Sequence, residues 1–274
     1  MIDLNLEILV QGASSGDAEA AEASLYGLID DVYTIAVRML WHPKDAEDAA
    51  ESVLSAALRQ FPSFPADGGV RPDVFRAAVK GLLNVPKSPV ERQRWTFEAQ
   101  AEDLARGLGE PVPPSLPPRT QPSLVEELKI GCTQMMLQCL DREHRLAYII
   151  GEILGQKNES AAEALELDQV TFARRLARAR ERMGTFMTTR CGLVNAEATC
   201  RCSARLGRSL LTGRVNQRRL LFVVPAADDV TPDSGGGASD PARVFREQRL
   251  RRAPETLVAK VWQCVSPGHD DDPV

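Results

Sequence analysis

The chain has 274 residues, of which 43% are hydrophobic and only 5% aromatic, and its formal net charge is −5. This length can supply two modest hydrophobic cores, and the scarcity of aromatic and β-branched runs favours helices throughout. The net negative charge argues against a simple basic protein that coats DNA, so any DNA binding would use a local basic patch. The apolar runs are too short to cross a bilayer, and the opening MIDLNLEILVQG has no basic lead, so we expect a cytoplasmic protein without membrane insertion.

Helical periodicity predicts two helices between Asp17 and Phe61, separated by a break at His42–Pro43. Each has an apolar stripe that can face a common core. The second helix begins with an acidic first turn, where carboxylates complement the helix dipole. The acidic residues of this turn are Asp45, Glu47 and Asp48. Helix capping alone is a sufficient explanation for any one of them.

A loop at 62–72 and a further helix at 73–83 lead to a basic run, Lys87–Arg94, which adjoins Trp95 and Phe97. Basic residues beside aromatic rings can stack on unpaired bases. Packing of such rings at a helix end is the commoner arrangement, and we favour it here.

A proline-rich stretch, GLGEPVPPSLPPRTQP, occupies residues 107–122 and predicts extended, semi-rigid chain. On this basis we expect four segments. They are a first helical domain at 16–100, a linker at 101–122, a second helical domain at 123–190 and a cysteine-containing extension at 191–274, with a flexible linker at 226–241.

The second domain contains the most informative stretch of the chain, NESAAEALELDQVTFARRLARARERMG, at residues 158–184. It predicts a short alanine-rich helix, a turn through Leu167 and a second helix with Asp168 as its N-cap, an arrangement that suits a helix-turn-helix. The second helix has an apolar stripe of Phe172, Leu176, Ala179 and Met183. A neighbouring arc holds Thr171, Arg174, Arg175, Arg178 and Arg182.

An arginine face is often only solvated surface. Here no acidic residue interrupts the arc, and a guanidinium can grip a phosphate or a guanine edge with two hydrogen bonds. We therefore interpret the arc as DNA-binding. Arg180 lies nearly opposite Thr171 on the helix, and we expect it to serve packing or an intramolecular ion pair.

Six cysteines without a secretory signal indicate reduced thiols. Cys191, Cys200 and Cys202 could join a fourth ligand in a tetrahedral zinc site. The candidates for that ligand are Cys132, Cys139, Cys264 and His269. Because the usual C-x-x-C pairs are absent, we expect no metal and no other cofactor. No nucleophile–base set, phosphate loop or zinc-hydrolase helix is present, so we do not expect an enzyme.

Three runs of the second half resemble the extracytoplasmic-function sigma factors of bacterial RNA polymerase: SLVEELKIGCTQMMLQCLDREHRLAYIIGEILG, AAEALELDQVTFARRLARARERM and CGLVNAEATCRC. The DAEDA stretch that begins at Asp45 resembles the first domain of that family. The likeness covers roughly Leu25 to Cys202 and is strongest in the second half. The chain departs from the family pattern at Glu51, where glutamine is common, at Ala78, where tryptophan is usual, and at Ala173, where a basic residue is frequent.

The resemblance implies two small α-helical domains without catalytic activity. The first would bind the clamp of core RNA polymerase, with Asp45, Glu47 and Asp48 as contacts, and would melt the proximal promoter element. The second would read the upstream promoter element through its helix-turn-helix. The implied partners are core polymerase and promoter DNA, with an anti-sigma factor as a further candidate.

Two alternatives stay open. One is a helix-turn-helix regulator that acts without polymerase, and the other is a metal- or thiol-responsive interaction module. The tail beyond Pro241 contains two short amphipathic segments separated at Pro254, which suit a cap on the second domain or on a partner's groove. Because a flexible linker precedes the tail, we predict that it regulates initiation and does not enable it.

Overall fold

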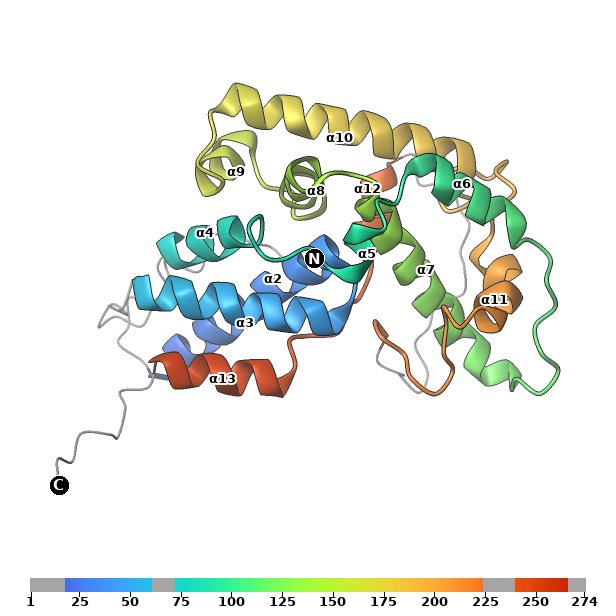
Figure 1. Ribbon diagram of the computed structural model, residues 1–274, viewed down its shortest axis with the longest axis horizontal. Coiled ribbons are helices and arrows are strands. Elements are labelled where there is room, and N and C mark those ends of the chain that lie inside the picture. The colour runs from blue at the N-terminus through green and yellow to red at the C-terminus, as the bar shows by residue number, and fades with distance from the viewer. Residues whose placement is uncertain (1–17, 61–71, 224–239, 266–274) are drawn as a thin grey trace. The chain divides into compact units, whose positions relative to one another are not determined.

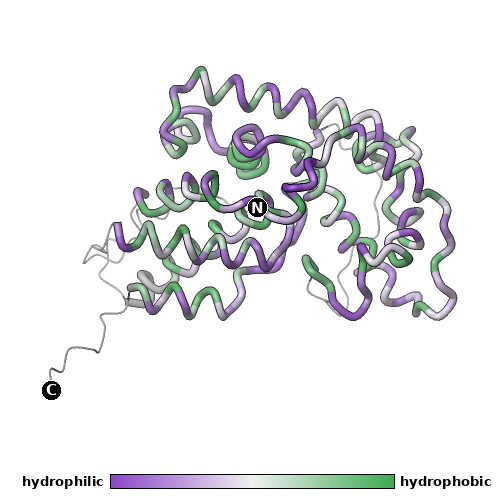
Figure 2. Tube along the Cα trace, viewed as in Figure 1, coloured by the Kyte–Doolittle hydropathy of each residue, from purple (hydrophilic) through white to green (hydrophobic). Residues whose placement is uncertain are grey.

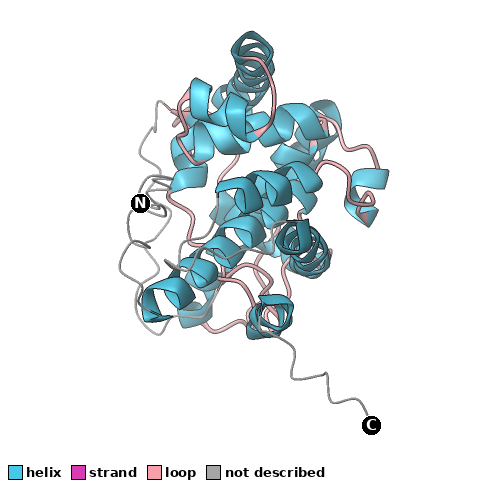
Figure 3. Ribbon diagram, turned by 90° about the vertical axis from the view of Figure 1, so that its left-hand side faces the viewer, coloured by secondary structure: helices cyan, strands magenta, loops and turns pink. Residues whose placement is uncertain are grey.

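The computed structural model describes residues 18–60, 72–223 and 240–265, and these are mostly helical (Figure 1). In these ranges there is no β-strand, and a single isolated bridge joins Cys191 to Cys200 (Figure 3). The all-α fold class is confirmed. Our expectations for residues 16–17, for 61–71, for most of the 226–241 linker and for His269 lie outside the described residues.

The chain divides into two compact units that interleave in the sequence. The N-terminal unit comprises residues 2–86, 159–169 and 252–274, and the central unit comprises 87–158 and 170–251. The structure thus places the division at 86/87, ahead of the predicted boundary at 100/101, and it distributes the tail between both units.

The N-terminal unit is built on a hairpin of α2 (Ala18–Leu40) and α3 (Pro43–Gln60), against which α4 (Pro72–Gly81) packs. The apolar stripes of these helices form its core, with Leu28, Ile29 and Leu54 fully buried. Gly81 allows α4 to approach α3 closely, since a Cβ there would lie 2.9 Å from Val53 Cγ1. The last helix in the described ranges, α13 (Glu255–Val265), packs on α3 and α2.

The short helix α9 (Asn158–Ala164) also groups with the N-terminal unit from Glu159 onward. Basic side chains of α4 pair with acidic ones of this segment, Arg76 with Glu163 at 2.6 Å and Lys80 with Glu166. These pairs are largely exposed and stabilise the contact by only about 0.2–1 kcal/mol each.

The central unit contains the remaining helices. They are α5 (Pro89–Arg92), α6 (Phe97–Arg106), the 3₁₀ turn η2 (Pro118–Thr120), α7 (Gln121–Gln138), α8 (Arg142–Tyr148), the π-helical turn η3 (Ile149–Ile153), α10 (Gln169–Arg190), α11 (Cys202–Leu211) and α12 (Pro241–Arg246). The first residue of α10, Gln169, groups with the N-terminal unit, and the rest of the helix belongs to the central unit. Polar and apolar residues alternate along α10, as expected for a helix that buries one face (Figure 2).

A buried ion cluster joins α5 to α8 in this unit. The carboxylate of Glu91 accepts hydrogen bonds from Arg142 at 2.6 and 2.8 Å and from Arg145 at 2.9 Å. Arg145 also donates to the carbonyls of Leu137 and Leu140 at the end of α7. Burial alone would raise the pKa of Glu91, but the hydrogen bonds and the two guanidinium charges keep that pKa below its ordinary value.

The proline-rich segment, which we expected to form a linker, groups with the central unit. Leu116 is buried in a cluster with Leu124 and Leu128 of α7, Leu206 of α11, and Val215. No helix forms at residues 107–117, and this irregular stretch inserts a single leucine into the core. The segment is therefore part of the central unit.

Residues 191–223 and α12 are equally integral to the central unit, although the sequence suggested an extension. The buried carboxylate of Glu127 on α7 accepts the backbone N–H groups of Leu221, Phe222 and Val223 at 2.6, 2.9 and 3.0 Å. The Phe245 ring of α12 meets Tyr148 edge-on at a centroid distance of 5.8 Å. Side-chain packing thus extends this unit well past Arg190.

Candidate functional site

The site is centred on α10, whose apolar stripe is buried as predicted. Phe172, Leu176, Ala179 and Met183 are at most 2% exposed. The π-helical turn η3 approaches this stripe closely at Gly151, where a Cβ would lie 2.7 Å from Leu176 Cδ2. This packing fixes the rotation of α10 and so determines which of its arginines face outward.

The basic arc of α10 falls into two classes. Arg174 and Arg178 are exposed and make no hydrogen bond or ion pair with any residue that the structure describes. Arg175 instead pairs with Glu143 of α8 at 2.8 Å. Arg182 donates to the carbonyl of Cys139 at 3.3 Å, and its guanidinium lies 5.3 Å from the centre of the Phe97 ring. Two arginines are therefore available to a ligand, and two have intramolecular partners.

The other two predictions for this helix concern Arg180 and Thr171. Arg180 Nε donates to Glu152 Oε1 at 2.6 Å, which confirms the expected intramolecular ion pair. Thr171 is partly buried in the first turn of α10. Asp168 directly precedes α10 in the chain, and its role as N-cap stays a prediction.

Val170 was not singled out from the sequence, yet its side chain is 69% exposed. It lies about 40° from Arg174 around the helix, at 100° per residue. An exposed apolar side chain beside free guanidinium groups can contact a thymine methyl group, while the arginines bind phosphate or guanine. The only sequence signal for this exposure of Val170 is that the residue lies outside the apolar stripe of α10.

The two helices expected to form the helix-turn-helix fall in different units, since residues 159–169 group with the N-terminal unit and α10 from Val170 with the central one. Their mutual packing therefore stays a prediction. Within the turn itself, Leu167 N donates to Ala162 O at 2.9 Å, and Glu166 has a positive φ of 51°. The segment thus reverses tightly after α9.

The aromatic residues next to the basic run at 87–94 are engaged within the central unit. Trp95 Nε1 donates to Gln100 Oε1 at 2.6 Å, and the Phe97 ring lies 5.1 Å from that of Phe186 on α10. These contacts confirm the packing interpretation that we favoured over base stacking.

The acidic first turn of α3 is the second candidate surface. Asp48 is exposed and pairs with Lys44 at 2.8 Å, while Asp45 is half-buried. The Glu47 side chain is only 14% exposed, because Lys44 lies 3.4 Å away and Thr256 of α13 donates to its carboxylate at 2.8 Å. The three predicted contacts therefore differ in accessibility.

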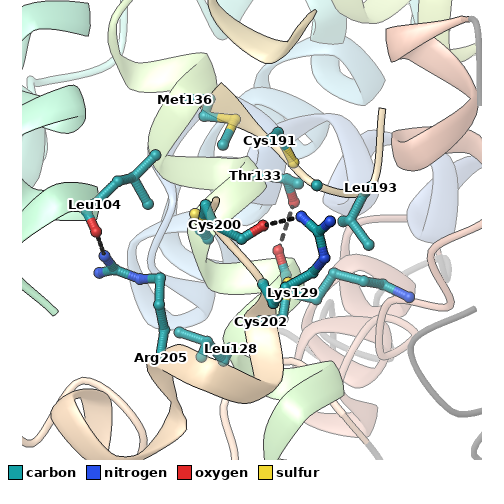
Figure 4. A pocket seen from close by; sticks show the side chains of 13 residues that line it. Leu104, Leu128, Lys129, Thr133, Met136, Cys191, Leu193, Cys200, Cys202 and Arg205 are labelled. Atoms are coloured by element: carbon teal, nitrogen blue, oxygen red, sulfur yellow. Dashed lines mark hydrogen bonds between the residues drawn. The ribbon is translucent and has the colours of Figure 1, made fainter. Parts of the chain in front are cut away.

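Four of the cysteines line one small cavity of about 20 Å³ in the central unit (Figure 4). They are Cys132 of α7, Cys191 directly after α10, Cys200 in the loop that follows, and Cys202 at the start of α11. Burial raises the pKa of the Cys132 thiol, and Cys200 and Cys191 add to this effect. All six cysteines are free thiols. Among the described residues, no three histidine, cysteine or acidic side chains are arranged to hold a metal ion.

None of the helices in the described ranges is both long and apolar enough to cross a membrane. Comparisons with protein-family models, with curated proteins and with solved structures found no match for this chain.

Proposed function

We propose that this protein is a sigma factor that binds bacterial core RNA polymerase and directs promoter-specific initiation. One observation carries the proposal: α10 presents two unpaired arginines, Arg174 and Arg178, beside an exposed valine, on a helix whose opposite stripe is buried. A free cationic edge on one rigid helix can enter a major groove. The resemblance to the sigma factors adds the second part of the proposal, which is that the acidic first turn of α3 binds core RNA polymerase.

The proposed mechanism consists of binding alone and involves no covalent step. Contacts of Arg174 and Arg178 with DNA phosphates would supply affinity, and any bidentate contact with a guanine would supply selectivity. Arg175 and Arg182 would contribute less than the sequence suggested, because DNA would have to displace Glu143 or the Phe97 and Cys139 contacts first. The acidic turn of α3 would bind the polymerase, and α10 would bind the promoter and so position the polymerase on it.

The test is transcription in vitro with core polymerase and a library of genomic promoters, comparing Arg174→Ala and Arg178→Ala with the wild type. A base-reading arginine should cost about 1–3 kcal/mol and relax selectivity at one position. A phosphate-binding arginine should weaken all promoters alike and reduce the salt dependence.

Arg190→Ala is the matched control, since Arg190 is exposed on the same helix but lies about 160° around it from Arg174. Equal losses for Arg190→Ala and for the two test variants would refute the assignment of α10 as the reading helix. Promoter binding that is unchanged by core polymerase would favour a regulator that acts without it.

A further inference from the structure

The C-terminal helix α13 lies against α3 in a regular register (Figure 1). Thr256 donates to Glu47 at 2.8 Å, Lys260 donates to Glu51 at 2.6 Å, and Cys264 Sγ lies 3.4 Å from Ser55 Oγ. Each pair is separated by 209 residues. Both helices therefore run in the same direction and meet at every fourth residue, one turn at a time.

Apolar contacts support this register on the adjacent face of α13. Leu257 and Val261 are fully buried, and the Trp262 ring meets Tyr26 of α2 edge-on at 6.1 Å. Just before the helix, Ala253 N donates to Asp30 Oδ1 at 2.7 Å. α13 is thus an amphipathic helix seated on the α2–α3 hairpin through a paired apolar and polar face.

The polar half of this contact falls on the surface that the proposed function assigns to polymerase. Glu47 is one of the three candidate contacts, and Glu51 is the residue that stands where the related family commonly has glutamine. Because Thr256 and Lys260 hold these two carboxylates, they are not available to another protein while α13 is in place.

We propose that α13 is a displaceable cover over the polymerase-binding face of α3, and that core polymerase binds only after α13 has left. This inference rests on the proposed function. Its physical basis is competition: a surface occupied by an intramolecular segment binds a partner with an affinity reduced by the fraction of open molecules.

The contact suits a cover that can leave. α13 has only 11 residues, and a helix of this length is marginal in water without a surface to pack on. The Lys260–Glu51 pair is partly exposed, so solvent screens it. A partner that offers its own cationic or hydroxyl groups to Glu47 and Glu51 can replace both interactions.

The structure provides a direct way to lock the cover. Ser55→Cys would place a thiol opposite the native Cys264, whose sulfur already lies 3.4 Å from the Ser55 oxygen. Oxidised glutathione would convert the two thiols into one disulfide by two successive exchange steps, with release of two reduced glutathione molecules. The same full-length variant can then be measured locked and, after reduction, unlocked.

Binding to core polymerase should weaken at least tenfold in the oxidised Ser55→Cys variant and recover on reduction. The double variant Ser55→Cys with Cys264→Ser is the control, since it carries the same new thiol and the same other cysteines but cannot lock. Its affinity should not respond to oxidation beyond the response of the wild type.

Leu257→Ala with Val261→Ala tests the opposite direction, because loosening the apolar side should raise the affinity for core polymerase several-fold. Gln263→Ala, at an exposed position of the same helix, should leave the affinity unchanged. A locked variant that binds polymerase as well as its reduced form would overturn the proposal. If no variant, locked or loosened, binds core polymerase, the proposed function itself is wrong and this inference falls with it.

Discussion

Replacement of Glu127 by alanine tests whether residues 191–223 belong to the central unit. The carboxylate lies on α7 and accepts three backbone N–H groups at 2.6–3.0 Å, two of which, those of Phe222 and Val223, are buried. A hydrogen bond to a charged acceptor contributes about 1.5–3 kcal/mol, and a buried donor left without a partner loses a comparable amount. Counting the two buried donors, we expect Glu127→Ala to lower the free energy of unfolding of the central unit by about 3–5 kcal/mol.

The assay is urea unfolding of the full chain combined with amide hydrogen exchange at residues 221–223. Those three amides should lose protection, and the unfolding midpoint should fall. Glu126→Ala is the control, since Glu126 is the adjacent acid of α7 and pairs with Lys129 at 2.6 Å in a partly exposed position. We expect that control to cost less than about 1 kcal/mol. A cost for Glu127→Ala as small as that of the control, with unchanged exchange, would show that the 221–223 segment is not held by this carboxylate.

Two further predictions concern pH and packing. Burial, with a contribution from the charge of Asp30, raises the pKa of Asp31 in the folded N-terminal unit from 3.8 to about 7. The folded state therefore binds a proton at Asp31 more tightly than the unfolded state does. As a result, the free energy of unfolding falls as the pH rises from about 4 to 7. Asp31→Asn should therefore raise the free energy of unfolding at pH 8 by at most about 4 kcal/mol, and it should have little effect at pH 4. The melting temperature measured at both pH values tests this, and an equal rise at both would contradict it. Gly151→Ala would place a Cβ 2.7 Å from Leu176 Cδ2, and such overpacking should cost about 1–3 kcal/mol in thermal unfolding. Adding Leu176→Ala should remove the clash, so a double variant that shows no coupling with Gly151→Ala would argue against this close contact.

Local periodicity determined the features of this protein that depend on a single helix. The all-α class, the buried stripe of α10 and the outward position of Arg174 and Arg178 follow from the 3.6-residue repeat alone. The sequence also indicated an intramolecular role for Arg180, although it did not identify Glu152 as the partner. In each case the relevant side chains are fixed by rotation around one helix axis.

Only the tertiary structure decided which arginines of the arc are free. Arg175 and Arg182 share the face of Arg174, but their partners, Glu143, Cys139 and Phe97, come from distant segments of the chain. Helical periodicity predicts the direction in which a side chain points from its helix. It does not predict which residues of other helices lie next to that side chain.

The same reason applies to the proline-rich segment and to the tail. Proline content suggested extended chain at 107–122, but the structure has turns, the 3₁₀ turn η2 and the start of α7 there, and the burial of Leu116 depends on the faces of α7 and α11. The sequence indicated two amphipathic tail segments that could cap the second domain or a partner's groove, and the structure places α12 in the central unit and α13 in the N-terminal unit. An amphipathic segment must bury its apolar face, and the sequence does not specify against which surface, because that choice is made by the packing of the whole chain.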